Sequence, residues 1–226
     1  QVQVRVNSFV RSVYNWMAIG LGLTGLVAYS VANLPEVRNV IFGSGIVFFG
    51  LIIAQLALVF TLSARIYRMQ AGTATLLFVL YSALNGATLS SIFLSYAQSS
   101  ITSTFFVCSA TFVACSVYGW TTRRDLTSFA GFLTMGLIGI VIASLVNLFV
   151  QSSAVSAIVS YVGVLVFVGL TAYDTQDIKN MAMAQPGDID AGALRKGAIL
   201  GALKLYLDFI NLFLMLLRIF GSSRDE

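Results

Sequence analysis

Seven long apolar segments follow one another along the chain, separated by short polar breaks. They cover residues 12–33, 39–62, 72–96, 101–120, 127–150, 153–175 and 197–220. Each is close to the roughly 20 residues that an α-helix needs to cross the hydrocarbon core of a bilayer. The breaks contain Gly, Pro, Asn, Ser or charged side chains, which are typical of connections. The pattern therefore predicts an all-α polytopic membrane protein with seven transmembrane helices.

The composition agrees with this class. Of 226 residues, 58% are hydrophobic and 10% are charged, whereas a soluble domain carries about 25% charged residues. No soluble block interrupts the apolar segments, so we expect a single domain over residues 1–226 with the lipid bilayer as its first partner. The net charge of +4 comes without a basic patch interleaved with aromatics, so we expect no nucleic-acid partner. Residues 1–6 alternate as a strand would, although an isolated terminus gives that pattern little weight.

The basic residues predict the orientation of the chain. Nine of the thirteen lie before the first segment or in the connections after the second, fourth and sixth segments: Arg5, Arg11, Arg65, Arg68, Arg123, Arg124, Lys179, Arg195 and Lys196. Basic residues collect on the cytoplasmic side. We therefore expect a cytoplasmic N-terminus and, after seven crossings, a periplasmic C-terminus. Arg218 and Arg224 leave open a re-entrant last segment instead.

The last apolar segment carries charges within its length. Lys204 and Asp208 lie in its body, and Arg218 lies near its end. An aspartate at the middle of a spanning helix costs about 2.5–3.5 kcal/mol on insertion scales, so it rarely faces lipid. We therefore expect the other helices to surround this one. Lys204 precedes Asp208 by four residues, so one interpretation is a neutralised pair that only fixes helix packing.

A second carboxylate suggests a functional interpretation. Asp174 lies near the inner end of the sixth segment, about one turn deeper than Asp177 and Lys179, which we expect to be solvated. Two carboxylates held close cannot easily both ionise, so Asp174 and Asp208 would titrate as a unit. Without their protons they would attract a hard cation such as Ca²⁺. Arg65, at the inner end of the second segment, is the expected counter-charge.

Several chemistries are excluded by what the chain lacks. Histidine is absent, so neither Ser/His nor Cys/His catalysis is available. Cys108 and Cys115 are seven apart, roughly 10 Å along a helix, which is too far for a disulfide. A Gly-x-Gly-x-x-Gly pattern at 20–25 has no preceding strand and predicts close helix packing. An intramembrane aspartyl protease would need Gly-x-Gly before Asp208, where 205–207 read Leu-Tyr-Leu. We expect no enzyme.

Two motifs carry a resemblance to a known family. They are Tyr173-Asp174-Thr-Gln-x-Ile-Lys179 and Leu205-Tyr206-Leu207-Asp208-Phe209-Ile210-Asn211-Leu212-Phe213. Together with Leu62-Ser-Ala-Arg65-Ile66, they resemble the transmembrane Bax-inhibitor-motif (Bax inhibitor-1-like) family, in the form found in bacterial inner membranes. The resemblance covers essentially the whole chain.

The resemblance implies a fold and a function. It implies seven helices, with the last wrapped by the other six, and a pH-sensitive Ca²⁺ leak controlled by Asp174 and Asp208, with Arg65 bonded to the pair. Arg218 matches a family arginine that latches the outer end of the pore against an acid on the second helix. This chain has no Asp or Glu between 38 and 65, so Gln55 would replace that acid with a weaker, neutral hydrogen bond.

The resemblance also implies an alternative from another class. Family members modulate a membrane protease or bind partners in cell death and stress, so this chain would be an interaction protein that conducts no ions. For the channel, the expected partners are Ca²⁺ and protons, and we expect no cofactor, with Ca²⁺ as the permeant ion. The expected location is the bacterial cytoplasmic (inner) membrane.

Overall fold

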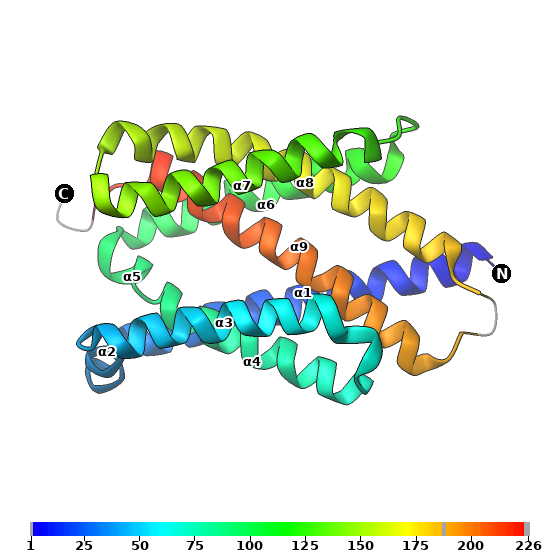
Figure 1. The fold of residues 1–226 in the computed structure, drawn as a ribbon, viewed down its shortest axis with the longest axis horizontal. Coiled ribbons are helices and arrows are strands. Elements are labelled where there is room, and N and C mark those ends of the chain that lie inside the picture. Colours follow the sequence, from blue (N-terminus) through cyan, green and yellow to red (C-terminus); the bar gives the residue numbers. More distant parts are fainter. Residues whose placement is uncertain (1, 187–188, 224–226) are drawn as a thin grey trace. The chain divides into compact units, whose positions relative to one another are not determined.

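The computed structural model describes residues 2–186 and 189–223, which are largely helical (Figure 1). Within that range, seven helices are long and apolar enough to cross a membrane, and the all-α prediction is confirmed. The elements in chain order are α1 (Val2–Asn33), α2 (Pro35–Phe42), α3 (Gly45–Arg65), the 3₁₀ turn η1 (Ile66–Arg68), α4 (Ala71–Leu89), α5 (Ile92–Ser95), α6 (Gln98–Thr121), α7 (Thr127–Val150), α8 (Ser153–Ala184) and α9 (Ala191–Phe220).

The helix boundaries differ from the prediction at polar ends and at two interior breaks. Residues 43–44 interrupt the segment predicted at 39–62, and residues 90–91 interrupt the one predicted at 72–96. Helix α1 already begins at Val2, so the alternation at 1–6 does not form a strand, and α8 continues to Ala184 rather than ending at 175. Hydropathy detects only the part of a helix that matches the hydrocarbon core, so polar extensions go unseen. The connection at 34–44 contains the short helix α2, which begins with Pro35 at its first position, where the missing N–H of proline costs nothing.

The chain forms two compact units. The first is Gln1–Ser95 with Ala182–Tyr206, and the second is Tyr96–Met181 with Leu207–Glu226. Helices α8 and α9 therefore each contribute to both units. The single domain expected over residues 1–226 stays a prediction.

In the first unit, α1 packs closely on α4. A Cβ added at Gly86 would lie 2.5 Å from the carbonyl oxygen of Thr24, and one added at Gly20 would lie 2.7 Å from the ring of Phe78. Small residues let helix backbones approach one another in this way. Of the Gly-x-Gly-x-x-Gly pattern, only Gly20 makes such a contact; Gly22 and Gly25 have nothing within 4 Å of an added Cβ. The packing interpretation holds for one of the three glycines.

A buried polar network centres on Tyr206 in the same unit. Its side chain is 0% exposed, and its hydroxyl lies 2.6 Å from Thr24 Oγ1 and accepts a hydrogen bond from Asn85 Nδ2 at 2.8 Å. Thr24 Oγ1 also lies 2.8 Å from the carbonyl oxygen of Ser82, to which it donates. The ring of Tyr206 meets the edge of Tyr81. Polar groups from α1, α4 and α9 thus satisfy one another at a depth where lipid offers no partner.

In the second unit, glycines set the spacing of α6, α7 and α8. A Cβ on Gly119 of α6 would overlap the carbonyl oxygen of Ala172 on α8, and one on Gly169 would reach Leu133 on α7. Phe209 packs its ring edge-on against Phe112 of α6, with 5.4 Å between centroids.

Both cysteines of α6 are free thiols, as their spacing predicts. Cys108 is buried, and its Sγ donates to the carbonyl oxygen of Phe209 at 3.7 Å. Cys115 is only partly buried. Their role in this structure is packing rather than covalent bonding.

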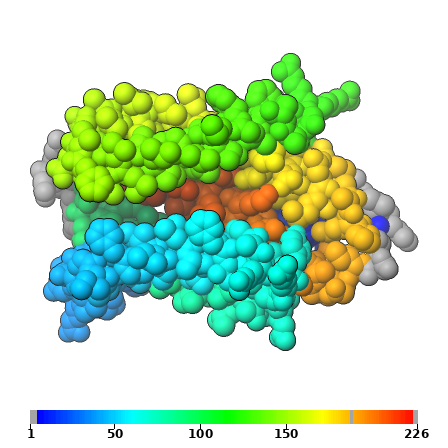
Figure 2. Space-filling model, viewed as in Figure 1, coloured from blue at the N-terminus to red at the C-terminus, as the bar shows by residue number. Residues whose placement is uncertain are grey.

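The spanning helices differ sharply in burial. Over the most apolar 18 residues of each span, 6% of the residues are buried in α3 and 11% in α7, whereas 61% are buried in α9. Figure 2 shows α3, in blue to cyan, and α7, in yellow-green, as rows of side chains on the face in view. Large apolar side chains that are exposed along α3 and α7 suit contact with lipid. The burial of α9 agrees with the inference that Asp208 avoids lipid; its enclosure by six helices stays a prediction.

The first prediction concerns helix spacing. Gly119→Ala places a methyl group against the Ala172 carbonyl, so we expect about 1–3 kcal/mol of destabilisation, the range typical of overpacking, and a lower melting temperature in detergent. The matched control is Gly131→Ala in α7, where an added Cβ meets nothing within 4 Å. It should leave stability unchanged or raise it by up to about 1 kcal/mol, because alanine favours helix. Equal shifts for both variants would contradict the packing account.

The second prediction concerns the Tyr206 network. Tyr206→Phe removes the hydroxyl bonded to Thr24 and Asn85 and leaves Asn85 with an unmet donor, so we expect a loss of about 1–2 kcal/mol. Thermal unfolding in detergent measures it. Tyr161→Phe is the control, because Tyr161 is 60% exposed and should tolerate the change. If both variants melt together with the parent, the network contributes nothing to stability.

Candidate functional site

Asp208 lies in the buried part of α9. It is 4% exposed, and it belongs to the second unit together with Phe209 and Leu212. Charged side chains are almost never buried to this degree unless they are paired, and Asp208 does make an interaction. The placement matches the expectation that this carboxylate contacts protein rather than lipid.

Asp174 lies on α8 in the same unit as Asp208. It is half-buried, and the residue after it is fully inside: Thr175 is 3% exposed, and its Oγ1 lies 3.4 Å from Ser116 Oγ on α6. Thr171, one turn earlier, is 0% exposed and donates to the carbonyl of Phe167. Asp174 therefore lies on a helix whose polar side chains turn toward protein neighbours. The pairing of Asp174 with Asp208 stays a prediction.

Arg65 is the last residue of α3 and is exposed. It belongs to the first unit, whereas Asp174 and Asp208 belong to the second. A cation at a helix C-terminus is favourable there in its own right, because the helix dipole is negative at that end. Its role as counter-charge to the aspartates stays a prediction, as does the pairing of Lys204, half-buried on α9, with Asp208.

The two residues of the expected outer latch lie in different units. Gln55 on α3 donates to the Leu51 carbonyl at 3.1 Å and to Thr88 Oγ1 on α4 at 3.4 Å. Arg218 on α9 is exposed and lines a cavity of about 330 Å³ in the second unit with Tyr96 and Asn147. Thr88 gives the amide of Gln55 a local partner. The latch between Gln55 and Arg218 stays a prediction.

The end of α8 differs from the expectation of a solvated surface. Asp177 and Lys179 are both half-buried. The Lys179 ammonium donates to the Trp120 carbonyl at 2.7 Å and lies 5.5 Å from the centroid of the Trp120 ring. Trp120 lies in the last turn of α6, whose carbonyls have no partner within their own helix. Lys179 therefore caps a neighbouring helix through a charge-assisted bond and a cation–π contact.

Gln176 holds the connection between α6 and α7. Its Oε1 accepts from the Leu126 N–H at 2.8 Å, and its Nε2 donates to the Arg124 carbonyl at 2.9 Å. In the same connection, hydrogen bonds from the hydroxyl and the backbone N–H of Thr127 hold the pKa of Asp125 below its ordinary value. Gln176 is two residues from Asp174, so these bonds fix the segment of α8 that carries the candidate carboxylate.

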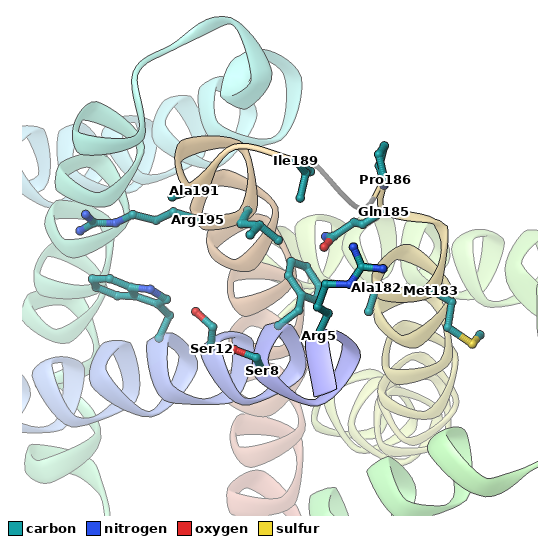
Figure 3. A pocket seen from close by; sticks show the side chains of 13 residues that line it. Arg5, Ser8, Ser12, Ala182, Met183, Gln185, Pro186, Ile189, Ala191 and Arg195 are labelled. Atoms are coloured by element: carbon teal, nitrogen blue, oxygen red, sulfur yellow. The ribbon is translucent and has the colours of Figure 1, made fainter. Parts of the chain in front are cut away.

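Sequence reasoning missed a basic cavity at the end of the first unit. It has a volume of about 510 Å³ and lies where α1 and α9 begin and α8 ends. Figure 3 shows Ser8 and Ser12 rising from α1 toward the α8–α9 connection, with Arg5 beside Gln185 and Arg195 at the other side. A signal was present, because Arg5, Ser8 and Ser12 recur at helical spacing, but the first apolar segment begins only at residue 12, so hydropathy does not reveal this face of the helix.

A resident metal centre has little support among the described residues. No group of three or more His, Cys, Asp or Glu side chains comes together there. Ca²⁺ takes six to eight oxygen ligands. A Ca²⁺ ion held by Asp174 and Asp208 would need further oxygen ligands from backbone carbonyls or water.

Comparison with known proteins agrees with the motifs. Residues 6–225 match the family described as "Inhibitor of apoptosis-promoting Bax1". The chain is 55% identical over 224 residues to the inner membrane protein YbhL of Escherichia coli strain K12, covering 99% of this chain and 95% of that protein. It is 45% identical over 219 residues to an uncharacterized protein of Rickettsia prowazekii, covering 96% and 90%.

A further relative comes from Streptococcus pyogenes. An uncharacterized membrane protein of Streptococcus pyogenes serotype M1 is 39% identical over 225 residues, covering 99% of this chain and 96% of that protein. The similarity thus covers nearly the whole length of this chain. Together with the seven apolar helices, these matches show that the chain is a polytopic membrane protein that belongs to the Bax inhibitor-1-like family.

Proposed function

We propose that the protein is a pH-sensitive Ca²⁺ leak channel of the bacterial cytoplasmic membrane, controlled by Asp174 and Asp208. The observation that carries the proposal is the burial of Asp208, 4% exposed within a membrane-spanning helix. An ionisable group at such a depth usually marks an ion or proton pathway, because burial without a function is costly. Asp174 lies in the same compact unit, and family membership supports the pairing.

Protonation would control the affinity of this site for cations. With a proton shared between them, the two carboxylates carry one negative charge instead of two and attract Ca²⁺ more weakly. When the proton leaves, the paired anions become a hard oxygen site that a divalent cation prefers. Conduction needs binding that is favourable enough for entry and weak enough for exit. Two carboxylates completed by water or backbone oxygens fit that requirement.

Arg65 supplies the proposed closing charge. A guanidinium bonded to the aspartates would occupy the place of the cation and keep the path shut. Arg65 is the last residue of α3 and is exposed, so its long side chain can adopt several rotamers. The Escherichia coli relative is an inner membrane protein, which supports the same location for this chain, and the distribution of basic residues supports a cytoplasmic N-terminus.

The third prediction tests the aspartate pair. In proteoliposomes loaded with a Ca²⁺-sensitive dye, the parent should show a flux that depends on pH when measured from about pH 6 to pH 8, because the charge of a coupled carboxylate pair depends on its protons. Asp174→Asn and Asp208→Asn should each lower the flux at the high-pH end by roughly tenfold, about 1.4 kcal/mol of lost attraction. Each should also flatten the pH profile. Arg65→Ala should raise flux, because the closing charge is gone.

The matched control is Asp125→Asn. It removes the same charge from the same unit but lies in an exposed connection, where the amide oxygen of asparagine can accept the same hydrogen bond from the Thr127 N–H. Its flux and pH profile should equal those of the parent. Flux that is absent, or indifferent to all three changes at Asp174, Asp208 and Arg65, would overturn the channel and favour an interaction protein that acts on a membrane protease or stress partner.

A further inference from the structure

The cavity at the start of α1 is built from two segments distant in sequence. Residues 5, 8, 12 and 16 lie on one face of α1 because they are three or four positions apart. The end of α8 and the first turns of α9 supply the opposite wall through Gln185, Leu194 and Arg195. All of these residues belong to the first unit. The cavity, of about 510 Å³, is within the size range of ligand sites, 300–1,000 Å³.

The charge of the lining is of one sign. Arg5 and Arg195 are its charged side chains, and no Asp or Glu occurs among the described residues that line it. The guanidinium of Arg195 lies 5.3 Å from the centroid of the Trp16 ring, which limits the positions it can take. Figure 3 shows Arg5 and Arg195 at opposite sides of the cavity, with the hydroxyls of Ser8 and Ser12 between them. Planar guanidinium groups and hydroxyls are the donors that suit a phosphate group.

The N–H groups at the start of α9 do not supply the attraction for an anion, because Asp190 already binds two of them. Its Oδ1 accepts from the Ala193 N–H at 2.9 Å, and its carbonyl accepts from the Leu194 N–H at 3.1 Å. These bonds use amides of the first turn that would otherwise face an anion. The two arginines therefore carry the attraction for a negative group.

We propose that this cavity binds the phosphate group of an anionic phospholipid. The cavity lies at the ends of two candidate membrane spans, Arg5–Asn33 and Ala191–Phe220, which is the level of the headgroups. Its lining also includes apolar side chains, among them Phe9, Ile189 and Leu194, which suit the glycerol and first methylene groups. Basic pockets between helix ends bind anionic headgroups by this combination of features. A bare phosphate ion would use the charges but leave most of the volume unfilled.

The fourth prediction uses Trp16 as a reporter. The chain has two tryptophans, so Trp120→Phe leaves Trp16 alone. In this background, vesicles containing brominated phosphatidylglycerol should quench Trp16 more strongly than vesicles containing brominated phosphatidylcholine. Arg5→Gln with Arg195→Gln should lower that preference by roughly fivefold per arginine removed. Ser12→Leu, which fills the cavity and keeps both arginines, should lower it as well.

The matched control is Arg11→Gln. Arg11 is exposed on the same helix and is not among the lining residues, so the change removes the same charge from the same end of the protein. The preference for phosphatidylglycerol should survive it. Circular dichroism and gel filtration in detergent check that each variant folds. If the double arginine variant does not fold, Ser12→Leu still tests the cavity, because it keeps both arginines.

The outcomes separate the sources of phosphate. Loss of preference in the cavity variants but not in Arg11→Gln supports the proposal. In a parallel arm, inorganic phosphate is titrated into the detergent-solubilised protein. Suppose that inorganic phosphate saturates the Trp16 signal, that the arginine changes abolish this effect, and that the parent shows no preference for phosphatidylglycerol vesicles. That result would mean that the cavity binds free phosphate, and it would overturn the lipid proposal. The lipid site is also overturned if Arg11→Gln loses the phosphatidylglycerol preference as much as the cavity variants do, or if the parent shows no such preference. It is overturned as well if only an acidic peptide such as polyglutamate, and no lipid, changes the Trp16 signal.

Discussion

A carboxylate inside a membrane-spanning helix needs protein around it, and this need orders much of the structure. Asp208 lies in α9, the most buried of the spanning helices among the described residues. Lipid offers no hydrogen-bond partner, so a helix that carries an ionised group must turn it toward other helices or a wet path. The exposed apolar rows of α3 and α7 are the converse case, because helices that carry no such group within the bilayer can face lipid.

The same rule governs the neutral polar groups. Thr24, Asn85 and Tyr206 come from three different helices, and each of them meets its partners within the protein. The same holds at helix ends. Two residues of α8 bind backbone groups there: Gln176 accepts from the N–H of Leu126 before α7, and Lys179 donates to the Trp120 carbonyl in the last turn of α6. Gly119 lets the backbone of α6 approach that of α8 closely, because it has no Cβ to meet the Ala172 carbonyl.

The proposals assign different tasks to the aspartates of the spanning helices and to the arginines of the cavity. The aspartates within the spanning helices would respond to protons and attract a cation in transit. The arginines at the start of α1 and α9 would hold a lipid phosphate at the membrane surface. Arg5 and Arg195 belong to the same compact unit as Arg65, so a lipid bound there and the expected closing charge act on one part of the chain.

The class, the seven helices and the family could be predicted from the sequence, because apolar runs of helix length and the motifs at Asp174 and Asp208 are local signals. The burial of Asp208 away from lipid was predictable too, since the cost of an aspartate facing lipid depends on residue type. Other features became visible only in the folded chain. Periodicity did not show that α8 runs to Ala184, that Lys179 caps α6, or that Arg195 lies on Trp16. Each of these depends on a partner more than 50 residues away or on a polar helix end, and no local pattern encodes such a partner.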